Sequence, residues 1–291
     1  MTLGNRGQAN RLLGYPKDAR LLIINADDFG MCHSVNEAIF CAFDKGMLRS
    51  TTLMVPCPWA PQAIHFLSNH PEVSFGIHLT VISEWVDYRW GPVTNRDKVP
   101  TLIDKAGYFH NLEQMHESLD HINLDELEME FRAQIETVLA AGLNPTHLDW
   151  HALRIGVRKA IFDLMLRLAK DYGLALRVMG CSSIEHTQHQ GLPCNDYDFM
   201  DSYHLDPADQ SVRYHQLLRE LPAGLSEWAV HPGLENAELL AIERDSRHVR
   251  QRDFDFLMSQ EAQDIAKEES IVPVDYRMLQ EVWRRKQSET S

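Results

Sequence analysis

Two adjacent aspartates, Asp27 and Asp28, follow directly on a short apolar run in the stretch LLIINADDFG. Neighbouring carboxylates raise each other's pKa, so such a pair is unusual at the end of a buried strand. A surface turn, a helix cap or a bound cation would each explain it. A cation beside the pair would keep both carboxylates ionised, because its charge offsets their repulsion.

Three histidines stand at the ends of other apolar runs. His78 lies at the end of VSFGIH, His151 at the end of THLDWH and His231 at the end of SEWAVH. A single histidine at such a point is more often a packed core residue. Histidine or aspartate at the ends of four expected strands is harder to explain by packing, because an α/β barrel brings its strand ends together on one face.

Two imidazoles and one carboxylate form a facial ligand set for a divalent ion, with positions left open for water and substrate. Such an ion lowers the pKa of bound water and polarises a carbonyl oxygen. A further carboxylate can then act as general base and a further histidine as general acid. Asp149 and His147 alternate with His151 along one strand face. Asp149 is therefore a candidate to orient a histidine, and His147 is either structural or an outer partner of the site.

The elements that must position these residues follow one repeating pattern, in which a short β-rich run is followed by a polar joint and an amphipathic segment. The expected strands are 21–25, 51–55, 73–79, 146–149, 174–178, 226–230 and 270–273. The clearest helical patterns cover 34–46, 125–141, 157–172, 253–267 and 275–286. Strands that alternate with helices predict a parallel sheet, and about seven such units favour a closed or nearly closed (β/α) barrel.

The helix after the first strand has local start and stop signals. Ser34 and Glu37 fit a capping box, and Gly46 offers a stop after the last apolar position. Because Ser34 would cap this helix, the two aspartates are not needed for that purpose.

One long segment departs from the repeating pattern. Residues 81–124 contain no long amphipathic helix, although a short one fits 112–119. Trp85 and Trp90 lie in this segment, and a loop of such length usually has a function, such as a lid or a substrate wall. We therefore expect a polar arm at 1–20, one barrel domain at 21–286 that carries this insertion, and a frayed tail at 287–291.

Bulk composition excludes several classes of protein. The formal net charge of −14 argues against a nucleic-acid partner, and no apolar run is long enough to span a membrane. The N-terminus has no apolar core typical of a secretory signal. The cysteines are odd in number and scattered, without a CxxC pair, which fits free thiols in a cytoplasmic protein.

Four motifs in order resemble the YdjC or ChbG-like carbohydrate deacetylase family, which is related to polysaccharide deacetylases. They are NADDFG at 25–30, GIHLT at 76–80, THLDWH at 146–151 and HPG at 231–233, and the resemblance extends from about Leu21 to about Trp283. It implies a distorted (β/α) barrel and one divalent ion, usually magnesium or zinc. It also implies hydrolysis of an N-acetyl group from an acetylated sugar, such as a chitooligosaccharide.

Carried over residue by residue, the resemblance implies that Asp28, His78 and His151 are metal ligands. It implies that Asp27 is the catalytic base and that His231 protonates the departing amine. The sequence would equally allow Asp27 and Asp28 to exchange roles.

The resemblance implies a place near the pocket for Arg177, at the end of LALRV. Trp85 and Trp90 could stack on a sugar face or simply pack within a lid. Family members often form homodimers, although nothing in this sequence marks an interface.

The chain also departs from the family pattern. The family often has HLDSH followed by further histidines, whereas this chain has Trp150 in place of the serine and Ala152 and Leu153 after the motif. These changes affect the choice of substrate more than the chemistry. The alternatives are a sugar isomerase, a phosphoesterase with two metal ions, or a non-catalytic sugar-binding relative.

Overall fold

All seven predicted strands are present in the computed structural model, which describes residues 6–154, 158–206 and 208–290. They are joined by an eighth, β6, which has only two residues and therefore leaves no apolar run in the sequence. The strands are β1 (Arg20–Phe29), β2 (Ser50–Leu53), β3 (Ser74–Leu79), β4 (His147–Trp150), β5 (Ala175–Leu176), β6 (Met200–Asp201), β7 (Gly224–Val230) and β8 (Ile271–Pro273).

One curled parallel sheet holds these strands in the order β5-β4-β3-β2-β1-β7-β6, and β8 pairs with the first residues of β1. Parallel strands linked by helices confirm the predicted α/β fold. Within the described residues, the two edge strands do not pair with each other, so the sheet forms a half-barrel. The side chain of Asn195 donates to the carbonyl oxygen of Val178 at 2.8 Å and connects the segments beside the two edges.

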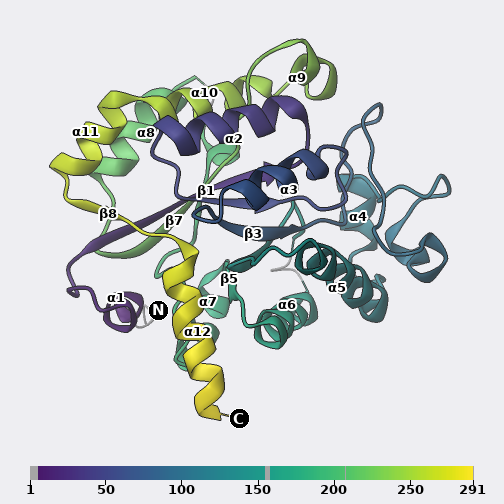
Figure 1. The fold of residues 1–291 in the computed structure, drawn as a ribbon, viewed down its shortest axis with the longest axis horizontal. Coiled ribbons are helices and arrows are strands. Elements are labelled where there is room, and N and C mark those ends of the chain that lie inside the picture. Colours follow the sequence, from purple (N-terminus) through teal and green to yellow (C-terminus); the bar gives the residue numbers. More distant parts are fainter. Residues whose placement is uncertain (1–5, 155–157, 207, 291) are drawn as a thin grey trace.

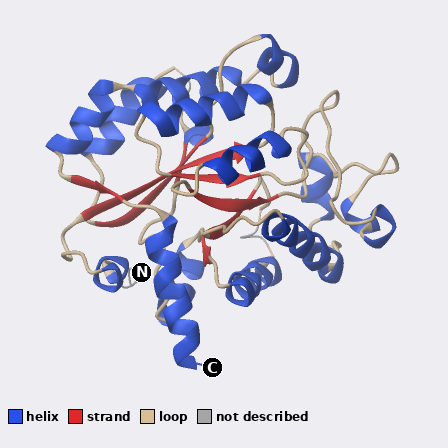
Figure 2. Ribbon diagram, viewed as in Figure 1, coloured by secondary structure: helices blue, strands red, loops and turns tan. Residues whose placement is uncertain are grey.

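Two groups of helices flank the curled sheet. In Figure 1, α2, α8, α10 and α11 lie along one side, and α5, α6 and α12 lie along the other. Figure 2 shows the strands enclosed between these two groups, with long loops at the end of the sheet where β3 ends. None of the helices in the described ranges is long and apolar enough to cross a membrane. The helices are α1 (Gln8–Leu13), α2 (His33–Lys45), α3 (Ala60–Asn69), α4 (Leu112–Ser118), α5 (Leu124–Ala140), α6 (Lys159–Tyr172), α7 (Cys181–His189), α8 (Gln210–Arg219), α9 (Ala237–Ile242), α10 (Arg247–Met258), α11 (Gln260–Glu268) and α12 (Tyr276–Thr290).

The predicted capping box at Ser34 and Glu37 is wrong. The helix α2 begins at His33, and its N-cap residue Cys32 makes no side-chain cap. Glu238 of α9 takes over this task, because its carboxylate accepts the backbone N–H of Ser34 at 2.7 Å and the hydroxyl of the same serine at 2.6 Å. A residue distant in sequence thus binds the free N–H groups at the start of this helix. The local sequence pattern assigns that role to Ser34.

Two other helix predictions change at their ends. The single helix expected over 253–267 is two helices, because Ser259 adopts an extended conformation and caps the start of α11 by accepting the N–H of Ala262. The last helix continues to Thr290, past its expected end, so most of the predicted tail is helical. The first residue of the helix predicted at 157–172, together with residues 1–5 of the expected arm, lies outside the described residues.

The C-terminal helix α12 reaches into the open half-barrel through Tyr276. The ring of Tyr276 stacks on His147 with centroids 3.5 Å apart and planes 7° apart, and its hydroxyl donates to Glu227 at 2.5 Å. A Cβ atom at Gly76 would lie 2.6 Å from the ring of His147, so the glycine beside the predicted ligand His78 makes room for this stack.

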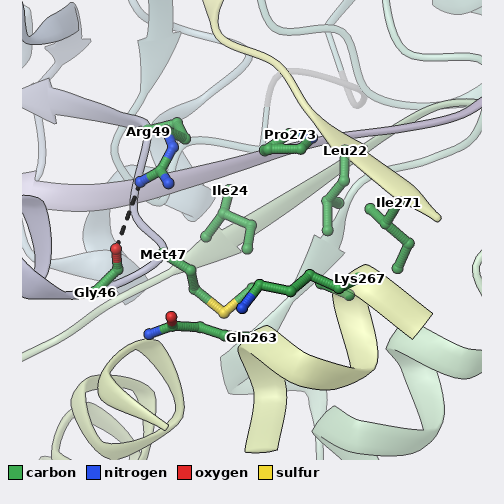
Figure 3. A pocket seen from close by; sticks show the side chains of 10 residues that line it. Leu22, Ile24, Gly46, Met47, Arg49, Gln263, Lys267, Ile271 and Pro273 are labelled. Carbon is green, nitrogen blue, oxygen red and sulfur yellow. Dashed lines mark hydrogen bonds between the residues drawn. The ribbon is translucent and has the colours of Figure 1, made fainter. Parts of the chain in front are cut away.

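A small cavity of about 150 Å³ lies between β1, β8 and α11 (Figure 3). Its lining is largely apolar, with Leu22 and Ile24 from β1 and Met47 beyond α2, and Arg49 and Lys267 are among its polar residues. None of the residues predicted to do chemistry lines it. Those residues gather instead at the opposite ends of the strands.

Candidate metal centre and active site

A break in the regular geometry of β1 brings the two aspartates to one place. In a regular strand, successive side chains point to opposite faces. Here the register between β1 and β2 shifts between Ala26 and Phe29, and Asp28 has a positive φ of 67°. Such a bulge redirects side chains at the end of a strand. As a result, Asp27 and Asp28 both line the same pocket.

Asp28, His78 and His151 form the candidate metal centre. The Oδ1 atom of Asp28 lies 3.4 Å from Nε2 of His78 and 3.0 Å from Nδ1 of His151. All three ligand atoms lie within 4.8 Å of one another. Ligands that bind a divalent ion at about 2.0–2.2 Å lie roughly 3–3.5 Å apart, so this donor set fits such an ion in chemistry and spacing.

The outward nitrogen of each imidazole meets a second carboxylate. Nδ1 of His78 lies 2.7 Å from Asp149, and Nε2 of His151 lies 2.6 Å from Glu84. Burial alone would lower both histidine pKa values. The carboxylates of Asp149 and Asp27 instead raise the pKa of His78 to about 9, and mainly Glu84 and Asp28 raise that of His151 to about 10. The surroundings therefore favour positive charge at this point.

The second oxygen of Asp28 is held by a buried arginine from α10. Nη2 of Arg250 lies 2.8 Å from Oδ2 of Asp28, and its Nε donates to Glu243 at 2.5 Å. Burial would raise the pKa of Asp28, but Arg250 and hydrogen bonds from His151 and His78 hold it well below its usual value. One oxygen of Asp28 is thus fixed by Arg250 while the other faces the histidines.

Arg177 holds the carboxylate of Asp27 in place. The guanidinium donates to both carboxylate oxygens of Asp27, at 2.7 and 2.8 Å, and Asn25 donates to Oδ1 at 2.8 Å. Burial opposes ionisation of Asp27, but the charge of Arg177 holds its pKa well below the usual range. Arg177 is 1% exposed and also pairs with Asp149 and Glu227, so protein carboxylates rather than solvent surround it.

His231 lies directly after β7, on the other side of Asp27. Its Nε2 is 3.9 Å from Oδ2 of Asp27. Its Nδ1 is 3.0 Å from the hydroxyl of Ser202, which donates in turn to the buried Asp253 at 2.6 Å. Asp253 also accepts the backbone N–H of His231 at 2.6 Å and the hydroxyl of Tyr214. A serine therefore connects this histidine to a buried carboxylate.

A second group of possible ligands shares one histidine with the first. Asp27, His78 and Asp149 also bring ligand atoms within 4.8 Å of one another. However, Nη1 of Arg177 lies 2.7 Å from Asp27 and 2.8 Å from Asp149, and Asp149 also contacts Nδ1 of His78 and accepts from Thr52 at 2.9 Å. The guanidinium already supplies the positive charge in this group.

The pocket above these groups has a volume of about 610 Å³. Trp85 lines it and is half-buried, whereas Trp90 is 2% exposed and donates its indole N–H to the carbonyl oxygen of Ile82 at 2.7 Å. Trp90 thus packs inside the 81–124 segment. Further walls come from Arg154, Trp150, Phe199, Tyr203 and His204.

The residues expected to do chemistry fall into two sets. Asp27, Asp28, His78, His151 and His231 meet in the pocket, with Asp149 and Arg177 against them. His147 instead lies deeper, against Tyr276, and in the described structure makes no hydrogen bond to the five.

Sequence reasoning missed several residues around the site. They are Glu84, Ser202, Arg250 and Asp253, and none belongs to a motif or follows a strand of recognisable length. The charge of Glu84 gave no distinct signal, because Asp87 and Arg89 stand in the same aromatic stretch.

Comparisons with known proteins identify the family of this chain. The sequence model of the family described as YdjC-like protein matches residues 21–268. A carbohydrate deacetylase of Thermoanaerobacter pseudethanolicus is 29% identical over 261 residues, which cover 89% of this chain and 99% of that protein. One of Enterococcus faecalis is 30% identical over 267 residues, with 89% and 97% covered. A crystal structure of a putative cellobiose-phosphate cleavage protein from Enterococcus faecalis superposes with a TM-score of 0.77 at 28% identity, and covers 89% of this chain and 98% of that one.

Proposed function

This chain belongs to the YdjC-like protein family, and we propose that it removes an N-acetyl group from an acetylated sugar by metal-dependent hydrolysis. The observation that carries the proposal is the meeting of Asp28, His78 and His151 around one point, with Asp27 and His231 beside it. The similarity to carbohydrate deacetylases over almost their full length supports the same reaction.

Asp28, His78 and His151 would hold the divalent ion. When bound, such an ion polarises the acetamide carbonyl and lowers the pKa of the attacking water. One carboxylate and two imidazoles accept zinc, manganese, cobalt or magnesium to differing degrees, and magnesium or zinc is our expectation.

Asp27 acts as the general base. Arg177 keeps its carboxylate ionised, so Asp27 is in the form that accepts a proton from water. The two hydrogen bonds from Arg177 also fix the plane of the carboxylate, and Oδ2 faces both His78 and His231, at 4.0 and 3.9 Å. Because a carboxylate with a lowered pKa is a weak base, it keeps the proton only briefly.

His231 acts as the general acid that protonates the departing amine nitrogen. When the hydroxyl of Ser202 donates to Asp253, its oxygen accepts N–H from Nδ1 of His231. That arrangement directs Nε2 toward Asp27 and the pocket, where a proton at this atom can be delivered to the substrate. Trp85 offers an aromatic face for the sugar ring at the mouth of the same pocket.

The proposal is tested by acetate release from N-acetylglucosamine, its β-1,4-linked oligomers and other N-acetylated sugars. We expect acetate from at least one sugar, loss of the activity after chelation, and recovery when a divalent ion is added back. Phosphate monoesters serve as the comparison, because a phosphoesterase with two ions is one of the alternatives. Hydrolysis of phosphate esters without acetate release from any sugar would refute the proposal.

Replacing Ser202 by alanine should lower kcat for the amide substrate about tenfold, because His231 loses the partner that orients it. The effect should be much smaller with p-nitrophenyl acetate, whose leaving group departs without a proton. Ser34→Ala is the matched control, because it removes another buried hydroxyl, whose hydrogen bonds go to Asn236 and Glu238 and not to His231. An equal loss on both substrates would assign Ser202 to the fold alone.

A further inference from the structure

Glu84 connects the long segment after β3 to the candidate metal centre. Its Oε1 lies 2.6 Å from Nε2 of His151, and its side chain is 15% exposed. The other nitrogen of His151, Nδ1, faces Oδ1 of Asp28 at 3.0 Å. The imidazole therefore lies between a carboxylate of the insertion and a carboxylate of β1.

Hydrogen bonds hold the chain on both sides of Glu84. The backbone N–H of Ser83 donates to the carbonyl oxygen of His110 at 3.0 Å, and the Ser83 hydroxyl accepts the N–H of Trp90 at 3.1 Å. Four residues after Glu84, the hydroxyl of Tyr88 donates to the carbonyl oxygen of Met31, close to the end of β1, at 2.7 Å. The segment thus presents the carboxylate at a fixed position.

A neutral imidazole has one N–H and one lone pair, so a partner at one nitrogen determines what the other can do. An N–H at Nε2 that donates to Glu84 leaves the lone pair on Nδ1, directed toward Asp28. Asp149 has the same relation to His78 through the opposite nitrogens, Nδ1 outward and Nε2 inward. Carboxylate partners of this kind orient histidine ligands and strengthen metal binding.

We propose that Glu84 is a positioning residue of the metal centre, and that the long insertion contributes to ion binding through it. The inference rests on the proposed ligand role of His151 and goes beyond it, because it gives part of the insertion a function. Glu84 does not touch the reacting atoms. It acts by fixing the ring of His151 with Nδ1 toward Asp28.

The test measures the affinity of the metal-stripped, full-length protein for Zn²⁺ and Co²⁺ by calorimetric titration. Glu84→Ala should weaken binding about 10- to 100-fold, and Glu84→Gln should weaken it less, because its amide oxygen can still accept N–H. The visible spectrum of bound Co²⁺ should change in Glu84→Ala, since ligand geometry determines it. Glu126→Gln is the matched control, because Glu126 holds the same insertion at Thr101 without touching His151.

Affinity within twofold of the parent chain in both Glu84 variants would overturn the inference, as would absence of metal binding by the parent chain. An equal loss in Glu126→Gln would assign the effect to anchoring of the insertion and not to the contact with His151. A different result would refute the proposed function. If the parent chain binds the ion but releases acetate from no sugar, the comparison of affinities still decides the role of Glu84.

Discussion

Replacing Asp27 by asparagine is expected to lower kcat for acetate release about 10²- to 10⁴-fold and to leave the affinity for the divalent ion nearly unchanged. Asparagine has almost the same shape, but its amide cannot accept a proton from the attacking water. The ion should still bind, because the converging ligand atoms belong to Asp28, His78 and His151. Acetate release and metal titration on the same preparation provide the two measurements.

The matched variant is Asp28→Asn, which should give the opposite result. Its main defect should be weak metal binding, with activity partly recovered at high metal concentration. The two positions are adjacent and equally buried, so a general loss of stability would affect both variants alike. If Asp28→Asn keeps its metal while Asp27→Asn loses it, the roles of the two aspartates are exchanged.

The positions of the five main site residues follow from sequence because each lies at the end of a strand. A parallel sheet brings strand ends together whatever its exact curvature, so the end of an apolar run is sufficient to place His78, His151 and His231 near Asp27. What the pattern could not give was the bulge at Asp28. A positive φ at a non-glycine residue has no signal in hydrophobic periodicity, yet it brings both carboxylates into one pocket.

Sequence patterns could not identify the residues that support the site, because these residues come from separate segments. Glu84 lies in a loop, Arg250 on the inner face of α10, and Ser202 beside a strand of two residues. Each is recognisable only by its contact with a residue distant in sequence. The same reason explains the wrong capping box, since the partner of Ser34 is Glu238 in α9.

Replacing Arg177 by methionine is expected to lower the free energy of unfolding by about 3–5 kcal/mol at pH 7. Methionine fills much of the volume but leaves Asp27, Asp149 and Glu227 buried without their shared cation. Urea unfolding measures the change. Arg177→Lys keeps one positive charge but not the planar set of donors, so its loss should be intermediate.

The stability difference between the parent chain and Arg177→Met should depend on pH. In the parent chain the pKa of Asp27 is lowered on folding, so its stabilising contribution is present above the unfolded value, near 4, and declines as the pH falls below it. Without Arg177, burial raises the pKa of Asp27 and Glu227, and the variant gains stability as the pH falls from 7 toward 4. The difference between the two proteins should therefore shrink on acidification.

Arg132→Met is the matched control for the loss of Arg177. Arg132 also pairs with two carboxylates, those of Glu128 and Asp171, but at the surface, where such pairs contribute about 0–1 kcal/mol. If Arg177→Met destabilised the chain no more than this control, Arg177 would not be holding buried charges together. The fixed position of Asp27 would then need another source, because Asn25 reaches only one of its two oxygens.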